Sequence, residues 1–219
     1  DGNALEVALK LREARASGDR ITVLTLGPKR ADEMLKKALA LTADAAVRVN
    51  ADDDPFDSAA KARVLAAAIQ KLGGADLILA GRQAADWEAG QVGGMIAEEL
   101  GLPCVPFVSR IEPDAEGLKL RQELDSGYAT VRLGGAAVVT VTNDETNVLR
   151  SAKVKDVLAA AKKPITVWEL ADLGVTAEIL ADPAVEVLDL ALPEVRRQSE
   201  IVEGETPQER AVNLARRLR

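Results

Sequence analysis

Apolar residues alternate between helical spacing and strand spacing along the first half of the chain. Between Ala4 and Arg12 apolar residues recur three and four residues apart, at Ala4, Val7 and Leu11, which predicts a helix with one buried stripe. The β-branched run 21–26 predicts a strand, because Gly27-Pro28 closes it with a turn. Further helices and strands alternate in the same way at residues 31–41, 45–49, 57–72, 75–80 and 91–100. The alternation predicts an α/β fold, a doubly wound and mostly parallel sheet with helices on both faces.

Three of these segments carry sharper expectations. The spacing in the helix at 31–41 places Met34, Leu35 and Ala38 on its inward face. The continuous apolar run 75–80 predicts a strand that is buried on both faces. Gly101 stands where a helix ending at residue 100 needs a C-terminal cap.

The pattern changes after Pro103. Three short strands at 106–111, 118–124 and 128–133 are separated by Pro, Asp and Gly, and they predict an antiparallel meander. An apolar strand returns at 137–142. We predict an α/β domain over residues 1–146 and an extension over residues 147–219. The extension is expected to hold a short helix near 155–161, an extended segment 164–168, an acidic stretch of weak structure, and a last helix that begins at the capping-box sequence Thr206-Pro207-Gln208-Glu209.

Composition limits the chemistry that the chain can perform. Its 219 residues include no His and one Cys, so the usual metal ligand and the usual acid–base side chain are absent, and no internal disulfide can form. A net charge of −7 argues against a nucleic-acid partner. No apolar run approaches the ~20 residues of a membrane span, so we expect a cytoplasmic protein without membrane insertion. The acidic run 52–54 lacks oxygen-ligand spacing, and we interpret it as a turn rather than a metal site.

The loop that follows the apolar strand 75–80 is the best candidate for a binding site. Ligands of open parallel sheets bind beyond the carboxyl ends of the strands, and a helix that begins there offers unpaired N–H groups to a phosphate. Gly90, Gly93 and Gly94 would let a ligand or another backbone approach closely. The spacing is neither the dinucleotide fingerprint nor a P-loop. From the residues alone, a glycine-rich turn without a ligand is an equally good interpretation.

The residues of this loop belong to a longer ordered pattern. Asp76-Leu77-Ile78-Leu79-Ala80-Gly81-Arg82-Gln83-Ala84, Asp86 and Gly90-Gln91-Val92-Gly93, followed in order by the segments 97–103, 137–141, 160–165, 171–174 and 203–207, closely resemble the β subunit of electron transfer flavoprotein. The resemblance covers essentially the whole chain. It implies an α/β fold of the adenine-nucleotide-binding type, with a further central strand ahead of Asp1. It also implies a cytoplasmic location, or the mitochondrial matrix in a eukaryote.

The resemblance implies an electron carrier rather than an enzyme with acid–base residues of its own. In the family, a partner α subunit holds most of the electron-accepting FAD, and the β subunit buries a second nucleotide. That nucleotide is AMP in most members and another FAD in electron-bifurcating ones. Trp87, Glu88 and Ala89 depart from the family pattern, whereas Val92 agrees with bifurcating members, so both nucleotides stay open. The implied cofactor-binding residues are Leu26, Gly81, Arg82, Gln83, Ala84, Asp86, Trp87, Glu88, Ala89, Gly90, Gln91 and Val92.

A second implied site is the loop through which the family docks on flavin-dependent dehydrogenases. It falls on residues 147–155, where Asn147 and Arg150 match the family and Val154 takes the place of an anchoring leucine. An exposed apolar side chain with basic neighbours is typical of a binding hot spot. The alternative is a solvated loop whose valine only covers the surface. The chain beyond this loop is expected to wrap the α subunit.

Two functions from other classes remain as alternatives. A stand-alone ATP- or AMP-binding module of the universal-stress type would purify as a flavin-free homodimer, whereas an electron carrier would co-elute with a yellow partner. A hydrolase of adenylated substrates would need an activated nucleophile, and the absence of His disfavours it.

Overall fold

The computed structural model describes residues 1–16, 18–51, 57–176, 185, 187–192 and 199–218. The chain forms two compact units, Asp1–Glu186 and Val187–Arg219, each held together by its own contacts. The acidic run 52–54 and much of the acidic stretch after Trp168, at 177–184, lie outside the described residues.

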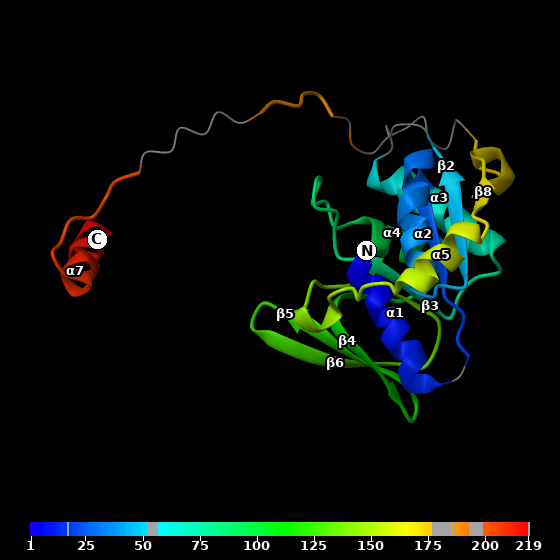
Figure 1. The fold of residues 1–219 in the computed structure, drawn as a ribbon, viewed down its shortest axis with the longest axis horizontal. Coiled ribbons are helices and arrows are strands. Elements are labelled where there is room, and N and C mark those ends of the chain that lie inside the picture. Colours follow the sequence, from blue (N-terminus) through cyan, green and yellow to red (C-terminus); the bar gives the residue numbers. More distant parts are fainter. Residues whose placement is uncertain (17, 52–56, 177–184, 186, 193–198, 219) are drawn as a thin grey trace. The chain divides into compact units, whose positions relative to one another are not determined.

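Helices and strands alternate through the first half of the chain as the sequence predicts (Figure 1). Gly101 ends the last of these helices in the left-handed conformation, with φ of 63°, and confirms the predicted cap. The elements are α1 (Gly2–Arg15), β1 (Thr22–Gly27), α2 (Asp32–Ala40), β2 (Ala45–Asn50), α3 (Ser58–Lys71), β3 (Leu77–Gly81) and α4 (Val92–Leu100).

The second half begins with the predicted meander. Its strands β4, β5 and β6 pair antiparallel in sequence order. β4 begins before the predicted start at 106, because its first residues pair in parallel with β7. The strand then bulges at Phe107, whose φ is 57°, and continues into the meander. The elements are β4 (Cys104–Asp114), β5 (Gly117–Leu124), β6 (Gly127–Leu133), β7 (Ala137–Val141), α5 (Val154–Lys162) and β8 (Thr166–Trp168).

The strands form two sheets rather than the single sheet that the sequence suggests. One is parallel with the order β1-β2-β8, and the other has the order β3-β7-β4-β5-β6. In the second sheet β7 pairs in parallel with both β3 and β4. The sheets are separate because β1 and β3 each pair on one side only within the described part of the chain. The predicted α/β class with mostly parallel strands is confirmed.

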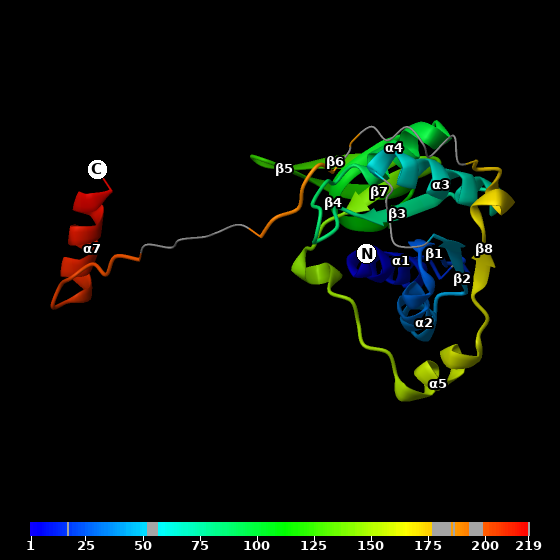
Figure 2. The ribbon, with the colours of Figure 1, turned by 90° about the horizontal axis from the view of Figure 1, so that it is seen from above.

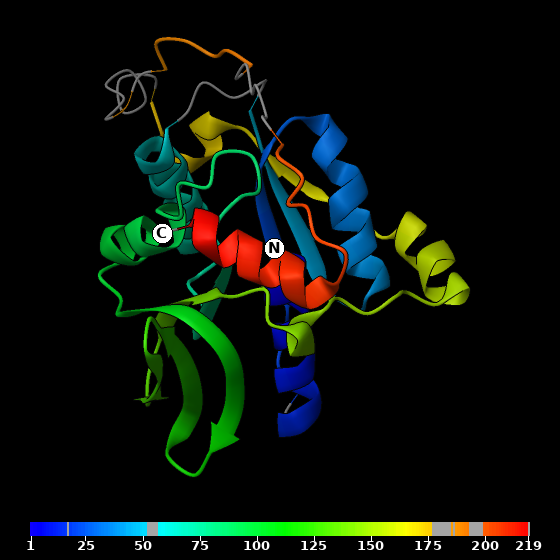
Figure 3. The same ribbon diagram turned by 90° about the vertical axis from the view of Figure 1, so that its left-hand side faces the viewer.

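Helices cover both faces of both sheets, which confirms the doubly wound arrangement. On β1, Val23 packs in the cluster of α2, while Leu24 packs with residues of α3. On β3, Leu77 and Leu79 pack with α1, while Ile78 packs with α4. Figures 2 and 3 show α2 and α3 on opposite sides of β1 and β2. Because α3 also packs along α4, one helical layer connects the two sheets.

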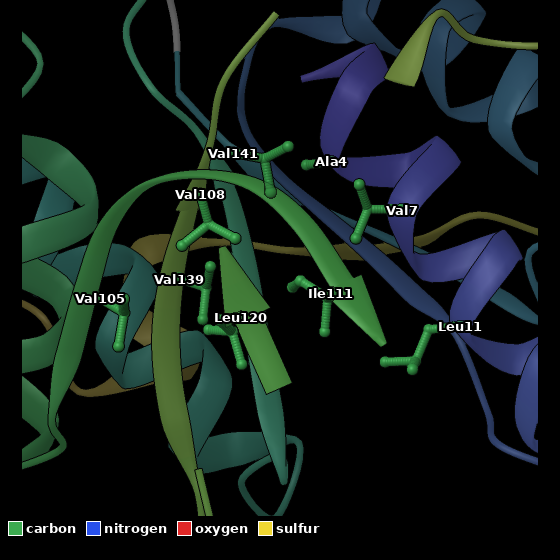
Figure 4. Close-up of a cluster of buried hydrophobic side chains, with 9 residues drawn as sticks. All are labelled: Ala4, Val7, Leu11, Val105, Val108, Ile111, Leu120, Val139 and Val141. Atoms are coloured by element: carbon green, nitrogen blue, oxygen red, sulfur yellow. The ribbon is translucent and has the colours of Figure 1, made fainter. Parts of the chain in front are cut away.

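A valine-rich core joins α1 to the second sheet (Figure 4). Ala4, Val7 and Leu11 of α1 face β7 and the meander, and their partners are Val105, Val108, Ile111, Leu120, Val139 and Val141. Each fully buried aliphatic side chain of this kind contributes about 1.5–3 kcal/mol. The core therefore fixes α1 against the sheet whose edge carries the candidate loop.

Two burial expectations are wrong. Met34 is 68% exposed, because the inward stripe of α2 is Leu35, Ala38 and Leu39, which packs against β1, β2 and α5. Strand β3 is half-buried at every position rather than buried on both faces, because no described strand covers its second edge.

Residues beyond 146 contribute to the first compact unit. Helix α5 packs on α2, and β8 pairs in parallel with β2, where Val47 lies opposite Thr166 and Val49 opposite Trp168. The extended segment predicted at 164–168 is therefore a strand of the sheet. Both elements thus belong to the first unit, and a functional division at residue 146 stays a prediction.

The second unit contains α7 (Pro207–Arg217). Thr206 Oγ1 accepts the N–H of Glu209 at 3.2 Å and Pro207 is the first helical residue, so the predicted helix start is confirmed. Val212, Leu214 and Leu218 are exposed. In the described parts of both units, no helix combines the length and apolar character needed to cross a bilayer.

Candidate functional site

The candidate loop leaves the sheet at the carboxyl end of β3. Gly81 is the last residue of that strand, and the N–H of Arg82 donates to the carbonyl oxygen of Val141 at 3.0 Å. The chain then crosses to the first residue of α4, Val92. The Asp1 carboxylate at the start of α1 lies against Gly81, and a Cβ at that position would require the Asp1 side chain to turn away. The loop therefore stands at the sheet edge where open α/β folds bind ligands.

The start of α4 offers backbone donors to an anion. The first helical hydrogen bond joins the N–H of Met95 to the carbonyl oxygen of Gln91 at 3.0 Å. The N–H groups of Val92, Gly93 and Gly94 precede it and have no partner within the helix. Gln91 makes no side-chain cap, and the first turn holds no acidic residue. Such a helix end attracts negative charge and fits a phosphate group.

The glycines around this helix start serve different purposes. A Cβ on Gly93 would lie 2.5 Å from Thr140 Cγ2, so α4 can approach β7 this closely only with glycine. Gly90 has φ of 63°, a left-handed conformation that glycine adopts without strain. At Gly94 a Cβ would meet no atom within 4 Å. At the start of α4, Gly93 therefore packs tightly against β7, whereas Gly94 faces open space.

The side chains of the loop contribute little to the core. Residues 83–91 are all exposed, and Trp87 keeps 56% of its surface accessible. Glu88 has φ of 50°, which is unusual for a residue with a side chain. Within the loop, the Glu88 N–H donates to the Ala84 carbonyl at 3.1 Å, and Asp86 accepts from the N–H of Trp87 at 2.9 Å.

The other predicted nucleotide contact, Leu26, lies on β1. Its half-buried side chain packs with Val49 of β2 and Val64 of α3. Residues 81–92 are continuous in the chain and lie together at the second sheet, whereas Leu26 belongs to the first. Its contact with a nucleotide stays a prediction.

Two of the three predicted docking residues are bound within the chain. Asn147 is buried, and its Nδ2 donates to the carbonyl oxygen of Ser109 at 2.8 Å. The Arg150 guanidinium lies 2.9 Å from Glu6 Oε1 and also binds Glu13, and its backbone N–H donates to Glu6 Oε2 at 3.1 Å. Both residues therefore fasten the segment onto α1 and β4 before any partner arrives.

Val154 differs from them in being exposed. It begins α5 and keeps 78% of its surface accessible, and Val157 and Leu158 on the next turn are exposed as well. Lys153 and Lys155 flank it in the chain. This apolar face with basic neighbours is a plausible protein-binding surface.

Arg150 forms an ion-pair cluster with Glu6 and Glu13, in which the guanidinium and the two carboxylates shift each other's pKa. Burial raises the pKa of Glu6, but hydrogen bonds and charge from Arg150 outweigh it and hold that pKa below its ordinary value. The hydrogen bond from Arg150 likewise lowers the pKa of Glu13, and the two carboxylates raise the pKa of Arg150. All three groups are therefore charged at neutral pH.

Sequence reasoning missed the α1 side of this cluster. Glu6 interrupts the apolar run Ala4–Leu9, and a carboxylate inside a buried stripe signals a buried partner. Its partner lies 144 residues away, so no local spacing identifies it. Lys10, on the same helix, adds a hydrogen bond to the carbonyl oxygen of Thr146.

Sequence comparison shows which proteins share these features. The family profile described as the electron transfer flavoprotein domain matches residues 1–173. The chain belongs to the electron transfer flavoprotein family.

The curated relatives agree with the predicted resemblance to the β subunits of electron transfer flavoprotein. The electron transfer flavoprotein subunit beta of Clostridium acetobutylicum is 36% identical over 93% of this chain and 78% of its own length. The caffeyl-CoA reductase–Etf complex subunit CarD of Acetobacterium woodii is 33% identical over 100% of this chain and 84% of its own length. The acryloyl-CoA reductase electron transfer subunit gamma of Anaerotignum propionicum is 32% identical over 77% of this chain and 64% of its own length.

Membership in the electron transfer flavoprotein family supports an electron-transfer role for the chain. Among the described residues, no group of three or more His, Cys, Asp or Glu could hold a metal ion. The residues at the start of α4 fit the phosphate of a nucleotide, since they combine N–H groups that have no partner within the helix, an open side at Gly94 and a first turn without acids.

Proposed function

We propose that the chain is the β subunit of a heterodimeric electron transfer flavoprotein, which relays electrons from a flavin-dependent dehydrogenase to a downstream acceptor. An α subunit holds the electron-accepting FAD in this proposal, and that flavin supplies the redox chemistry. The chain positions the flavin and carries the docking surface. Relatives named as subunits of CoA-ester reductase complexes favour a partner enzyme that acts on an acyl-CoA.

The loop 81–92 and the start of α4 are proposed to bind an adenine nucleotide, AMP or FAD. The observation that carries this proposal is the set of unpaired N–H groups at Val92, Gly93 and Gly94, beside a loop that ends at a left-handed glycine. These amides would hold a phosphate and orient the nucleotide at the sheet edge. Heat release of the nucleotide from the purified complex, followed by chromatography, distinguishes AMP from FAD. Isolation as a flavin-free homodimer with ATP would instead favour the universal-stress type of module.

Replacing Gly90 with glutamate is expected to expel the nucleotide, because the carboxylate adds bulk and repels a phosphate. The matched control is Gly90→Ala, which imposes the same backbone strain at φ of 63° without the charge. Nucleotide content per protein is the measurement. We expect Gly90→Glu to purify without nucleotide and Gly90→Ala to retain most of it. Full occupancy in Gly90→Glu would contradict this site.

The proposed docking surface is the α5 face that begins with Val154. In an assay of the dehydrogenase, this protein serves as the electron acceptor. Replacing Val154 with serine is expected to raise the dehydrogenase's KM for this acceptor about tenfold, because truncating a hot-spot anchor weakens docking by about 1–2 kcal/mol. The kcat should stay unchanged, since electron transfer follows docking. Met34→Ser removes a similarly exposed apolar side chain from α2 and should leave KM unchanged. Equal KM values for the Val154→Ser and Met34→Ser variants would contradict the proposal that the α5 face is the docking surface.

A further inference from the structure

Thr142 carries a buried hydroxyl that has no hydrogen-bond partner. The residue is 2% exposed, and no donor or acceptor in the described chain reaches its Oγ1. The neighbouring Thr140 hydroxyl, in contrast, accepts the N–H of Phe107 at 3.0 Å. Buried polar side chains are almost always paired, so an orphan of this kind needs an explanation.

Thr142 stands directly beside the start of the candidate loop. The N–H of Thr142 donates to the carbonyl oxygen of Val108 at 3.0 Å, which extends the β7–β4 pairing one step past the strand end. On its other side β7 pairs with β3, with Val141 opposite Gly81. The next residues along the two strands, Thr142 and Arg82, are therefore neighbours at the carboxyl edge of the sheet.

Strand alternation places the Thr142 side chain on the face that α4 covers. Val139 and Val141 pack into the α1 core, whereas Val138 packs with Ile96 and Ala97 of α4. Side chains alternate faces along a strand, so Thr140 and Thr142 share the face of Val138. The close approach between Gly93 and Thr140 Cγ2 confirms this face for Thr140.

The direction of α4 brings its first residues level with Thr142. Ile96 and Ala97 lie at the level of Val138, and Gly93 lies at Thr140, so α4 runs antiparallel to β7. Continuing the same progression puts the helix start, at Gln91 and Val92, over Thr142. An unpaired hydroxyl thus lies beneath a helix start whose first N–H groups are unpaired as well.

We propose that Thr142 Oγ1 donates a hydrogen bond to the phosphate of the bound adenylate, the group that AMP and FAD share. This inference rests on the proposed function. A phosphate oxygen held by the α4 amides is a strong acceptor, and a threonine hydroxyl can rotate to meet it. The loop residues 83–91 beside Thr142 are exposed and contribute little to the core, so the loop can shift to admit the phosphate. In this proposal the nucleotide supplies the hydrogen-bond partner that the Thr142 hydroxyl lacks within the described chain.

The test compares wild type, Thr142→Val and Thr142→Ser as full chains in their natural assembly, stripped of nucleotide and titrated with AMP. Valine keeps the shape and removes the hydroxyl. We expect Thr142→Val to weaken AMP binding about tenfold, and to raise the nucleotide-free Tm by about 3 °C because an unpaired buried hydroxyl is gone. Thr142→Ser should return the Kd to within about threefold of wild type. Titration with FAD should show the same order of affinities.

The opposite shifts in Tm and Kd separate a ligand contact from a structural role. If Thr142→Val binds AMP and FAD like wild type, the hydroxyl serves a buried water or no partner, and the inference is overturned while the proposed nucleotide site stands. The inference is likewise overturned if serine fails to restore binding. If wild type binds neither nucleotide, the proposed site itself fails and the inference falls with it.

Discussion

Alanine at Gly93 is expected to destabilise the first compact unit by about 3 kcal/mol relative to alanine at Gly94. The new Cβ would lie 2.5 Å from Thr140 Cγ2 and 3.6 Å from the Cβ of Ala80. Thr140 cannot turn away without breaking its hydrogen bond to the N–H of Phe107, so either α4 lifts off the sheet or that bond is lost. Overpacking of this kind costs about 1–3 kcal/mol, and a lost hydrogen bond costs about 1 kcal/mol more.

Gly94→Ala is the matched control because it lies in the same turn and its Cβ meets no atom within 4 Å. Both variants gain similar helix propensity, so their difference isolates the contact with Thr140. Denaturant unfolding measures it. Equal stabilities would show that α4 does not lie this close to β7, and would also remove the basis for placing Thr142 under the helix start.

The second large effect is expected at Arg150. Replacing it with glutamine should destabilise the first unit by about 2 kcal/mol, because the Glu6 side chain, 4% exposed, would lose the cation that hydrogen-bonds it and keep only the charge interaction with Lys10. We expect a smaller loss of stability than for a fully buried ion pair, because Arg150 itself is 37% exposed and solvent screens its charge. Arg15→Gln is the control: Arg15 is the last residue of α1, the helix that carries Glu6, and losing its exposed pair with Asp19 should cost below about 0.5 kcal/mol.

The pH dependence of the Arg150→Gln effect follows from the lowered pKa of Glu6. A carboxylate with a lowered folded-state pKa stabilises above its ordinary value of 4.5, and this stabilisation is lost as the pH falls through the lowered pKa. In the variant, burial without the Arg150 hydrogen bonds raises the pKa of Glu6 instead. The stability difference between wild type and variant should therefore be largest at neutral pH, and should shrink as the pH falls from the raised pKa of Glu6 in the variant, above 4.5, to its lowered pKa in the wild type. A difference that stays constant with pH would contradict the role of Glu6.

Much of the fold is readable from local sequence. Gly101 caps α4 and Thr206 caps α7 because capping depends on the residues within one turn. The meander follows from short strands separated by turn residues. Met34 is exposed against the prediction for a reason that is partly nonlocal: helical spacing gives a stripe, but the centre of the stripe is set by β1, β2 and α5, and α5 lies more than 110 residues further along the chain.

The candidate site shows the same limit. The loop 81–92 is recognisable from residues that are close in sequence, whereas Val154 is recognised only through the family resemblance. The loop follows β3 at the carboxyl end of the sheet, and Val154 is exposed. Arg150 and Asn147 match a docking pattern, yet their bonds to Glu6 and Ser109 depend on the tertiary fold. The orphan hydroxyl of Thr142 could not be predicted either, because it is defined by partners that the fold does not supply.

The segment between Arg150 and β8 is fastened at both ends, by the carboxylates of α1 on one side and by pairing with β2 on the other. In between, Lys36 Nζ donates to the carbonyl oxygen of Ala161 at 3.0 Å, and Lys163 Nζ donates to that of Ala43 at 3.2 Å. If a dehydrogenase docks on this segment as proposed, the surface around Val154 is already ordered, and binding costs little entropy. Fast association and dissociation would suit the electron relay proposed for the chain, because each transfer needs only a brief complex.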